Sequence, residues 1–340
     1  MHIGAKVKGK SRGKCMGFFT SMVSPFFSQV FIAINIDAIT CTIKVIRIKR
    51  DRQVESLTKE FKTTENQIPM EAVKLIRRYK HSYPFTYVSV VIKTLSQGVV
   101  LQKDSRDFFA GNLRASECEI SSSDTIRVFA KRSMIKDYLR RYDVIGGVDF
   151  LFSPFLLIDK NAHDLPTLGN NVYVLLQRSN IALTVVYKGV ATFSGFFIAE
   201  GEVPMLNKEE QRPDIELKNF DELSLDEDFD EFAKIALDPS LDRLQTDMFI
   251  PNLDETKIVY DDMPKARIIS KILVDAIKEY YQNPLYQGEF IDKVILLDAC
   301  KLSDQAHELI AKELMLETVK RDIDLPDVLI EFAQRELKGR

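Results

Sequence analysis

The sequence predicts an α/β fold of two domains, and three observations lead to this prediction. The chain has 340 residues, of which 45% are hydrophobic, which is enough apolar material for two cores. Residues 30–48 contain a nearly continuous apolar run followed by β-branched residues that alternate with polar ones, as two paired strands do. Residues 172–198 repeat this design, which predicts a duplicated fold.

The first half reads as strand, strand, strand, helix, strand. The opening arm ends at Asp37, a tight turn spans 37–40, and the second arm runs over 41–48. A third strand is expected over 54–63. Residues 68–79 place apolar side chains on one face of a helix, and 87–92 form a buried strand.

An insertion into the first domain is expected over about 94–158. The stretch 93–125 is polar, and its body would be a strand at 126–130, a helix at 133–142, and a strand or strand plus helix start at 148–158. Residues 159–171 contain Pro, Gly and Asn-Asn and predict a connection between the domains.

The second half is expected to hold three more strands, a long helix and a buried strand. The strands cover 172–177, 182–187 and 190–198, the amphipathic helix 265–281, and the buried strand 293–297. Ser303 suits the N-cap of a helix over 304–315. A closing edge segment at 319–325 and a terminal helix at 327–337 complete the chain. The expected division is an extension at 1–29, domains at 30–160 and 161–326, and a C-terminal helix at 327–340.

Composition argues against several classes of function. A net charge of −3 gives no overall signature of nucleic-acid binding. The four cysteines (15, 41, 118, 300) and four histidines (2, 81, 163, 307) are scattered, so no zinc site, disulfide framework or metal site is indicated. A reducing cytoplasm is the expected setting, and a packing or surface role is expected for His307. Asp261 and Asp262 are expected to be solvated.

Two segments have an uneven charge. Residues 1–52 hold ten Lys or Arg against two Asp, and the basic start precedes an uncharged run over 15–36. We weigh a membrane or secretory segment, a basic tail that touches anionic lipid, and a disordered extension or a true start at Met22. Residues 209–231 hold eleven acids against two bases; we expect an exposed helix and loop, with docking of a basic partner as the alternative.

The opening hairpin resembles a known phosphate-binding motif. Asp37 ends the first strand, Thr40 and Thr42 follow, and Lys44 lies on the second strand. This arrangement resembles the phosphate-1 hairpin of the actin, sugar-kinase and chaperone superfamily, most closely its PilM-like and FtsA-like bacterial members. The resemblance covers about residues 30–330. It implies an actin-like (ribonuclease H-like) duplicated fold with two domains and an inserted subdomain.

Three departures from the family motifs argue against nucleotide binding. Ile39 stands at the family glycine, where a phosphate must approach the backbone N–H groups closely. The second hairpin turn, Leu176-Gln177-Arg178-Ser179, lacks the family's Asp and Gly. Asp298-Ala299-Cys300 replaces Gly-Gly, and Lys301 would crowd a base. Asp37, Thr40, Thr42 and Lys44 are therefore expected to form a vestigial site with no cofactor and no metal, and Asp37→Ala to cost less than about 1.5 kcal/mol.

The resemblance implies a non-catalytic cytoplasmic scaffold at an inner-membrane machine: a type IV pilus, a secretion system or a flagellar motor. It would bind the cytoplasmic N-terminal peptide of a PilN-like single-pass membrane protein and form a homo-oligomeric ring. The alternative is a divergent ATPase that binds ATP and Mg²⁺. An FtsA-like membrane-tethered filament former would need an amphipathic C-terminal tether, but residues 332–340 are short and charged.

The peptide groove implied by the resemblance lies between the early strands and the insertion. It would offer aromatic anchors in a basic rim. The other interpretation is that its aromatic residues are ordinary core residues. The predicted groove residues are Lys59, Phe61, Phe129, Lys131, Arg132, Tyr138, Arg140 and Arg141.

Overall fold

The computed structural model describes most of the chain between residues 27 and 338, apart from one long internal segment and several short ones. The described residues are 27–63, 67–103, 106–109, 113–123, 125–164, 169–199, 262–286 and 288–338. The described residues all belong to one compact unit. The expectations for the acidic segment 209–231 and for the extension up to residue 26 lie outside the described residues.

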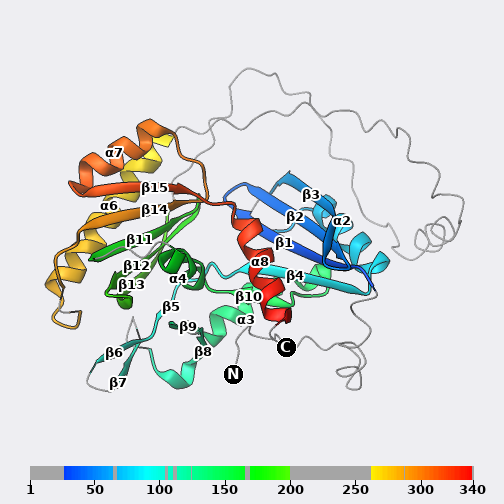
Figure 1. The fold of residues 1–340 in the computed structure, drawn as a ribbon, viewed down its shortest axis with the longest axis horizontal. Helices are drawn as coiled ribbons and strands as arrows, with labels where there is room; N and C mark the ends of the chain where they lie inside the picture. Colours follow the sequence, from blue (N-terminus) through cyan, green and yellow to red (C-terminus); the bar gives the residue numbers. More distant parts are fainter. Residues whose placement is uncertain are drawn as a thin grey trace, which may run out of the picture. The chain divides into compact units, whose positions relative to one another are not determined.

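The first sheet has the strand order β10-β4-β1-β2-β3 (Figure 1). Strands β1, β2 and β3 form an antiparallel meander, whereas β4 runs parallel to β1 and β10 parallel to β4. Alternation explains its two faces: Phe31 and Ala33 of β1 enter one core, and Ile32 and Ile34 enter another. The strands are β1 (Gln29–Asp37), β2 (Thr40–Lys49), β3 (Arg52–Lys62), β4 (Phe85–Val91) and β10 (Phe150–Phe152).

The second sheet has the strand order β13-β12-β11-β14-β15. Here β11, β12 and β13 form the antiparallel meander, and β14 and β15 continue from β11 in parallel. All seven residues of β11 are buried, as befits a central strand covered on both faces. The strands are β11 (Asn170–Leu176), β12 (Asn180–Tyr187), β13 (Val190–Ile198), β14 (Lys293–Asp298) and β15 (Glu317–Asp322).

The two sheets share one topology, which confirms the duplicated fold. In each, the first strand lies at the centre, two antiparallel strands extend on one side, and two parallel strands extend on the other. Each parallel strand is reached by a crossover connection that contains a helix, as parallel pairing requires. This arrangement, present twice in one chain, is the actin-like (ribonuclease H-like) fold.

Helices cover the sheets and join them. One core cluster contains residues of both sheets together with helices α4 (Pro154–Asp164) and α8 (Leu325–Lys338). Helix α4 packs on β11 and β12, although it follows the first sheet in sequence, and α8 returns to pack on β1, β2 and β4. Helices α6 (Asp262–Gln282) and α7 (Asp304–Leu314) cover the other face of the second sheet.

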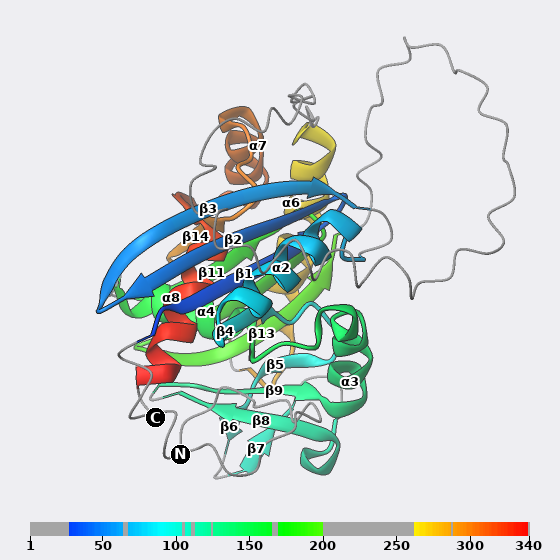
Figure 2. The ribbon, with the colours of Figure 1, turned by 90° about the vertical axis from the view of Figure 1, so that its right-hand side faces the viewer.

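The outer face of the first sheet carries helix α2 (Met70–Ser82), whose apolar residues share a core cluster with β1 and β2 (Figure 2). Helix α3 (Arg132–Arg140) lies beside β9 (Arg127–Lys131) of the insertion, and its Tyr138 joins the same cluster. The expected helices and strands of both halves are present with ends shifted by a few residues. Ser303 caps α7 as predicted, because its side chain accepts a hydrogen bond from Ala306 N.

The inserted strands form two small sheets between β4 and α3. One has the order β5-β9-β8 and the other pairs β6 with β7. Val99 N donates to Ser194 Oγ of β13 at 2.8 Å, and a Cβ on Gly98 would lie 2.9 Å from the same oxygen. The strands are β5 (Gln97–Val99), β6 (Leu101–Lys103), β7 (Arg106–Phe108), β8 (Cys118–Ser122) and β9 (Arg127–Lys131).

The expectation that residues 148–158 belong to the insertion is wrong. Phe150–Phe152 pair with Ser89–Val91 of β4 as an edge strand of the first sheet. Pro154 then begins α4, which extends to Asp164 into the segment expected to be a plain connection. A proline is tolerated in the first helical turn because its missing N–H would have no partner there.

Candidate functional site

Five segments converge at the carboxyl ends of the central strands, the edge where open α/β folds place their sites. They are the end of β1 with Asp37, Lys93 after β4, the β11–β12 turn with Arg178 and Ser179, the first turn of α6, and the β14–α7 turn. Their side chains form one set of contacts, which we call the closing network. Its members are Asp37, Lys93, Arg178, Ser179, Asp262, Lys265, Asp298 and Cys300.

Asp37 joins the first sheet to the second. Its Oδ2 accepts from Arg178 N at 2.7 Å, and its Oδ1 accepts from Ser179 N at 2.8 Å and Ser179 Oγ at 2.6 Å. Lys93 Nζ lies 3.5 Å from Oδ1 and donates to Ile36 O at 2.7 Å. A buried carboxylate therefore takes the backbone donors of the opposite hairpin turn.

The charges of Asp37 and Lys93 depend on each other. Burial opposes ionisation of Asp37, but the Lys93 ammonium and the hydrogen bonds from Ser179 and Arg178 outweigh it and hold the pKa of Asp37 below its ordinary value. Burial lowers the pKa of Lys93, and the Asp37 carboxylate opposes that shift. Removing either partner would leave the other charge buried and uncompensated.

Arg178 extends the network across the second half. Its Nη2 donates to Cys300 O at 2.9 Å, and its Nη1 lies 3.7 Å from Asp262 Oδ1. Asp262 Oδ2 in turn accepts from Ser303 N at 2.9 Å, and the buried Lys265 Nζ donates to Arg178 O. The β11–β12 turn, the start of α6 and the β14–α7 turn are thereby fastened to one another.

Asp298 organises the β14–α7 turn from within. Its Oδ1 accepts from Cys300 N and Lys301 N, and its Oδ2 accepts from Leu302 N, each at 2.9 Å. His307 Nε2 lies 3.0 Å from Oδ2. Burial opposes ionisation here too, yet the contacts from His307, Cys300 and Leu302 keep the pKa of Asp298 below its ordinary value.

The residues present do not fit a nucleotide. A phosphate on the actin-like fold needs free backbone N–H groups at the hairpin turns. Here the Asp37 carboxylate already takes the N–H groups of Arg178 and Ser179. Asp298 takes three N–H groups of the third turn. Neither the β11–β12 turn nor the β14–α7 turn contains a glycine. A phosphate at the β11–β12 turn would also lie close to the negative charge of the Asp37 carboxylate.

The four residues predicted as a vestigial site separate in the structure. Thr40 Oγ1 donates to Asp37 O at 3.0 Å and stabilises the turn. Lys44 Nζ lies 3.3 Å from Asp324 Oδ2 and also contacts Asp327, so it ties β2 to the start of α8. Thr42 lies between them on β2, half-buried. Only Asp37 belongs to the closing network.

The prediction that Phe129 and Tyr138 anchor a peptide is wrong. Phe129 is 1% exposed in the core of the insertion, where its ring meets Phe109. Tyr138 is 4% exposed and donates its hydroxyl to Val91 O. Phe61 is half-buried and packs against the same core cluster as Tyr138. Phe129 and Tyr138 therefore stabilise the fold and present no surface to a peptide.

The basic residues of the predicted groove differ in their exposure. Lys59, Arg132 and Arg140 are exposed, whereas Lys131 and Arg141 are half-buried. Arg132 lies 3.1 Å from Glu119, and Arg140 lies 3.4 Å from Asp137. The Arg141 guanidinium lies over the Tyr138 ring at 4.4 Å, so this residue contributes to packing.

Sequence reasoning missed several members of the network. Lys93 directly follows a buried strand beside β1, a position that could have signalled it. Asp262 was expected to be solvated but contacts Arg178 and Ser303. His307 was expected to pack or to lie at the surface; it is buried and contacts Asp298, a pairing that nothing in the sequence spacing indicates.

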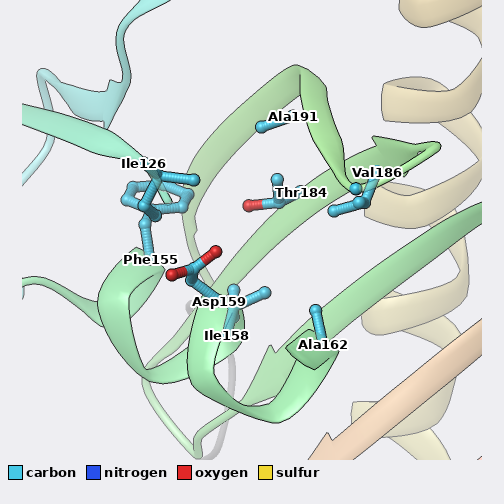
Figure 3. A pocket seen from close by; sticks show the side chains of 9 residues that line it. Ile126, Phe155, Ile158, Asp159, Ala162, Thr184, Val186 and Ala191 are labelled. Carbon is cyan, nitrogen blue, oxygen red and sulfur yellow. The ribbon is translucent and has the colours of Figure 1, made fainter. Parts of the chain in front are cut away.

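A small cavity lies away from this network, between α4, the β12–β13 hairpin and Ile126 (Figure 3). Asp159 and Thr184 direct their oxygens into it. Its volume of about 10 Å³ is near the minimum that holds one water molecule.

Among the described residues, no helix is long and apolar enough to span a membrane, and no group of His, Cys, Asp and Glu could hold a metal.

Comparison with solved structures finds distant likeness to proteins of actin-like fold. A protein with actin-like ATPase fold and unknown function from Bacteroides thetaiotaomicron is 10% identical, with 87% of this chain and 92% of that chain covered and a TM-score of 0.43. A PilM–PilN type IV pilus biogenesis complex is 11% identical, with coverage of 91% and 96% and a TM-score of 0.39. Ethanolamine utilization protein EutJ from Carboxydothermus hydrogenoformans is 10% identical, with coverage of 86% and 84% and a TM-score of 0.38.

Comparison of sequences gives two domain matches. Residues 26–159 match a domain of unknown function (DUF8569), and residues 172–338 match another domain of unknown function (DUF8341). No curated protein matches the chain. Each half of this actin-like protein is thus similar to a domain family whose function is unknown.

Proposed function

We propose that this chain is a non-catalytic scaffold built on the actin-like fold. The observation that carries the proposal is the position of Asp37, whose carboxylate takes the N–H groups of Arg178 and Ser179. On this fold, those donors serve a nucleotide phosphate only when they are free. With these donors satisfied inside the protein, the part of the chain that the structure describes offers a two-sheet body and no arrangement of groups for phosphoryl transfer.

The partner we propose is a PilN-like single-pass protein of the inner membrane, with the scaffold on the cytoplasmic side as a ring of copies. Support comes from the sequence resemblance to PilM-like proteins over about residues 30–330. Binding a peptide needs only exposed backbone or side-chain pockets and no chemistry, so it is compatible with a closed nucleotide site. The exposed Arg132 and Arg140 remain candidate contacts, without the aromatic anchors first expected.

Affinity capture from native membranes tests this proposal. The full chain with an affinity tag, cross-linked in cells and purified from solubilised membranes, is expected to retrieve a small single-pass protein as its most enriched partner. Arg132→Glu with Arg140→Glu is expected to reduce that enrichment, while Lys271→Glu with Lys278→Glu, exposed cations on α6, leaves it unchanged. Enrichment of soluble proteins alone would contradict the proposed partner.

A further inference from the structure

A buried hydroxyl group faces the small cavity beside α4. Thr184 lies on the face of β12 that packs against α4, in line with Ala182 and Val186 of the core cluster. It is 3% exposed, yet its Oγ1 atom makes no hydrogen bond with any residue that the structure describes. Burying a hydroxyl group without a partner is unfavourable, and nearly all buried polar side chains have one. A partner for Thr184 is therefore expected inside the cavity that its oxygen faces (Figure 3).

The opposite wall of the cavity supplies a second polar group. Asp159 lies in the middle of α4, and Figure 3 shows one of its carboxylate oxygens directed toward the Thr184 hydroxyl. Its Oδ2 atom also accepts a hydrogen bond from Thr125 Oγ1 of the insertion. A carboxylate can accept about four hydrogen bonds, so the bond from Thr125 does not exhaust its capacity.

The other walls and the volume restrict what can bind here. The walls are aliphatic and aromatic side chains of α4, of the β12–β13 hairpin and of Ile126. The volume of about 10 Å³ admits one water molecule and no larger ligand. An ammonium ion of similar size has only donors, and the apolar walls would leave some of them without an acceptor. Water both donates and accepts, so it matches a carboxylate on one side and a hydroxyl group on the other.

We propose that this cavity binds one ordered water molecule that bridges the Thr184 hydroxyl and the Asp159 carboxylate. The water donates a hydrogen bond to Asp159 and accepts one from Thr184. A buried water needs a polar site, sufficient room and at least two polar partners, and the cavity meets each condition. The bridge satisfies the hydroxyl group of Thr184 and joins β12 to α4.

This water completes a connection between the second sheet and the insertion. Thr125 donates to Asp159, so the water, Asp159 and Thr125 together connect β12 to the segment that precedes β9. A separate contact joins the insertion to β13, where Val99 N donates to Ser194 Oγ at 2.8 Å. The bound water therefore helps to hold the insertion against the second sheet, although the insertion interrupts the sequence of the first half.

Magnetic relaxation dispersion of the water signal tests the proposal on the full chain, because it counts the water molecules that stay inside a protein longer than it takes to tumble. Thr184→Val keeps the shape of the side chain and removes the hydroxyl group. It is expected to lose about one such water relative to the wild type. Its melting temperature is expected to fall by about 2–4 °C, because the hydrogen bonds of the water are lost.

Two further variants serve as controls. Thr184→Ser keeps the hydroxyl group and is expected to retain the water. Thr192→Val makes the same change on the neighbouring strand β13, where the hydroxyl group donates to Val185 O at 3.3 Å, and is expected to leave the count unchanged. Equal counts for the wild type and Thr184→Val would overturn the proposal. A higher melting temperature for Thr184→Val would overturn it too, because the hydroxyl group would then face a dry cavity.

A high-resolution crystal structure of the wild-type chain gives a test that needs no variant. Density for one water is expected within hydrogen-bond distance of both Thr184 Oγ1 and the Asp159 carboxylate. Density beside only one of the two groups would contradict the bridge. An anomalous peak at this position in crystals soaked with thallium(I) would assign the site to a monovalent cation and overturn the proposal.

Discussion

Replacing Asp37 with alanine is expected to lower the free energy of unfolding by about 3–5 kcal/mol, as for breaking a buried ion pair. The change removes three hydrogen bonds from Arg178 and Ser179. It also leaves the positive charge of Lys93 buried without its counter-charge. This exceeds the loss of under about 1.5 kcal/mol expected from the sequence, where Asp37 was an ordinary turn residue. Urea denaturation followed by circular dichroism measures it.

A double-mutant cycle shows whether the loss arises from the pair. Lys93→Met alone is expected to destabilise, because it leaves Asp37 without its counter-charge. Asp37→Ala with Lys93→Met is expected to cost less than the two single losses added together. Strict additivity, or a loss near 1 kcal/mol for Asp37→Ala, would contradict the role given to Asp37.

The effect of Asp37 also has a defined pH dependence. Its pKa in the folded protein lies below the ordinary value of 3.8, so its contribution is complete above that pH. As the pH falls through the depressed pKa, the carboxyl group takes up a proton and the contribution is lost. The stability difference between the wild type and Asp37→Ala is therefore expected to narrow in strong acid.

Asp298→Ala is expected to cost about 3 kcal/mol or more, because one buried carboxylate holds the whole β14–α7 turn. Hydrogen bonds to charged groups contribute about 1.5–3 kcal/mol each, and their loss leaves the N–H groups of Cys300, Lys301 and Leu302 without this acceptor. Urea denaturation gives the cost. Amide hydrogen exchange at residues 300–302 is expected to accelerate.

Asp322 provides the control. It pairs in register with Asp298 on the neighbouring strand β15, but its side chain is 72% exposed and lies 3.7 Å from Lys320. Asp322→Ala is expected to change stability by no more than about 0.5 kcal/mol, as for a surface substitution. Similar losses for Asp298→Ala and Asp322→Ala would show that the buried hydrogen bonds do not organise the turn.

Local patterns in the sequence were sufficient to predict the two sheets. The alternation of Cys41, Ile43 and Val45 with polar residues marks β2 as a strand with one buried face, and the structure confirms it. The apolar spacing in 265–281 likewise marks α6. Burial of one face of a strand or helix sets a regular spacing of apolar residues, and this spacing can be recognised within a short stretch of sequence.

The end of the insertion could not be predicted in the same way. Residues 148–158 are almost uniformly apolar, which fits a buried strand, a buried helix or both. Strand β10 has only three residues, and its place beside β4 is set by long-range pairing. Length and composition therefore gave no reason to separate it from the insertion.

The closing network was also beyond local patterns. Asp37 and Ser179 are 142 positions apart, and Arg178 and Cys300 are 122 apart. Motif comparison identified all three turns as lacking the glycines of a nucleotide site, but it assigned Asp37 no partner. In the structure, the Asp37 carboxylate occupies the N–H groups that would otherwise bind a nucleotide phosphate, and Lys93 is its counter-charge. This arrangement depends on how the two halves fold together, which the sequence pattern of neither half indicates.

The most direct test of the closed site is a thermal melt of the full chain with increasing Mg·ATP. A ligand at a hundredfold excess over its dissociation constant adds about 2.7 kcal/mol to the stability of a protein that binds it. Because Asp37 and Asp298 already take the backbone donors of two turns, we expect the melting temperature to stay constant into the millimolar range. A saturable rise that requires both ATP and Mg²⁺ would contradict the account and favour a working nucleotide site.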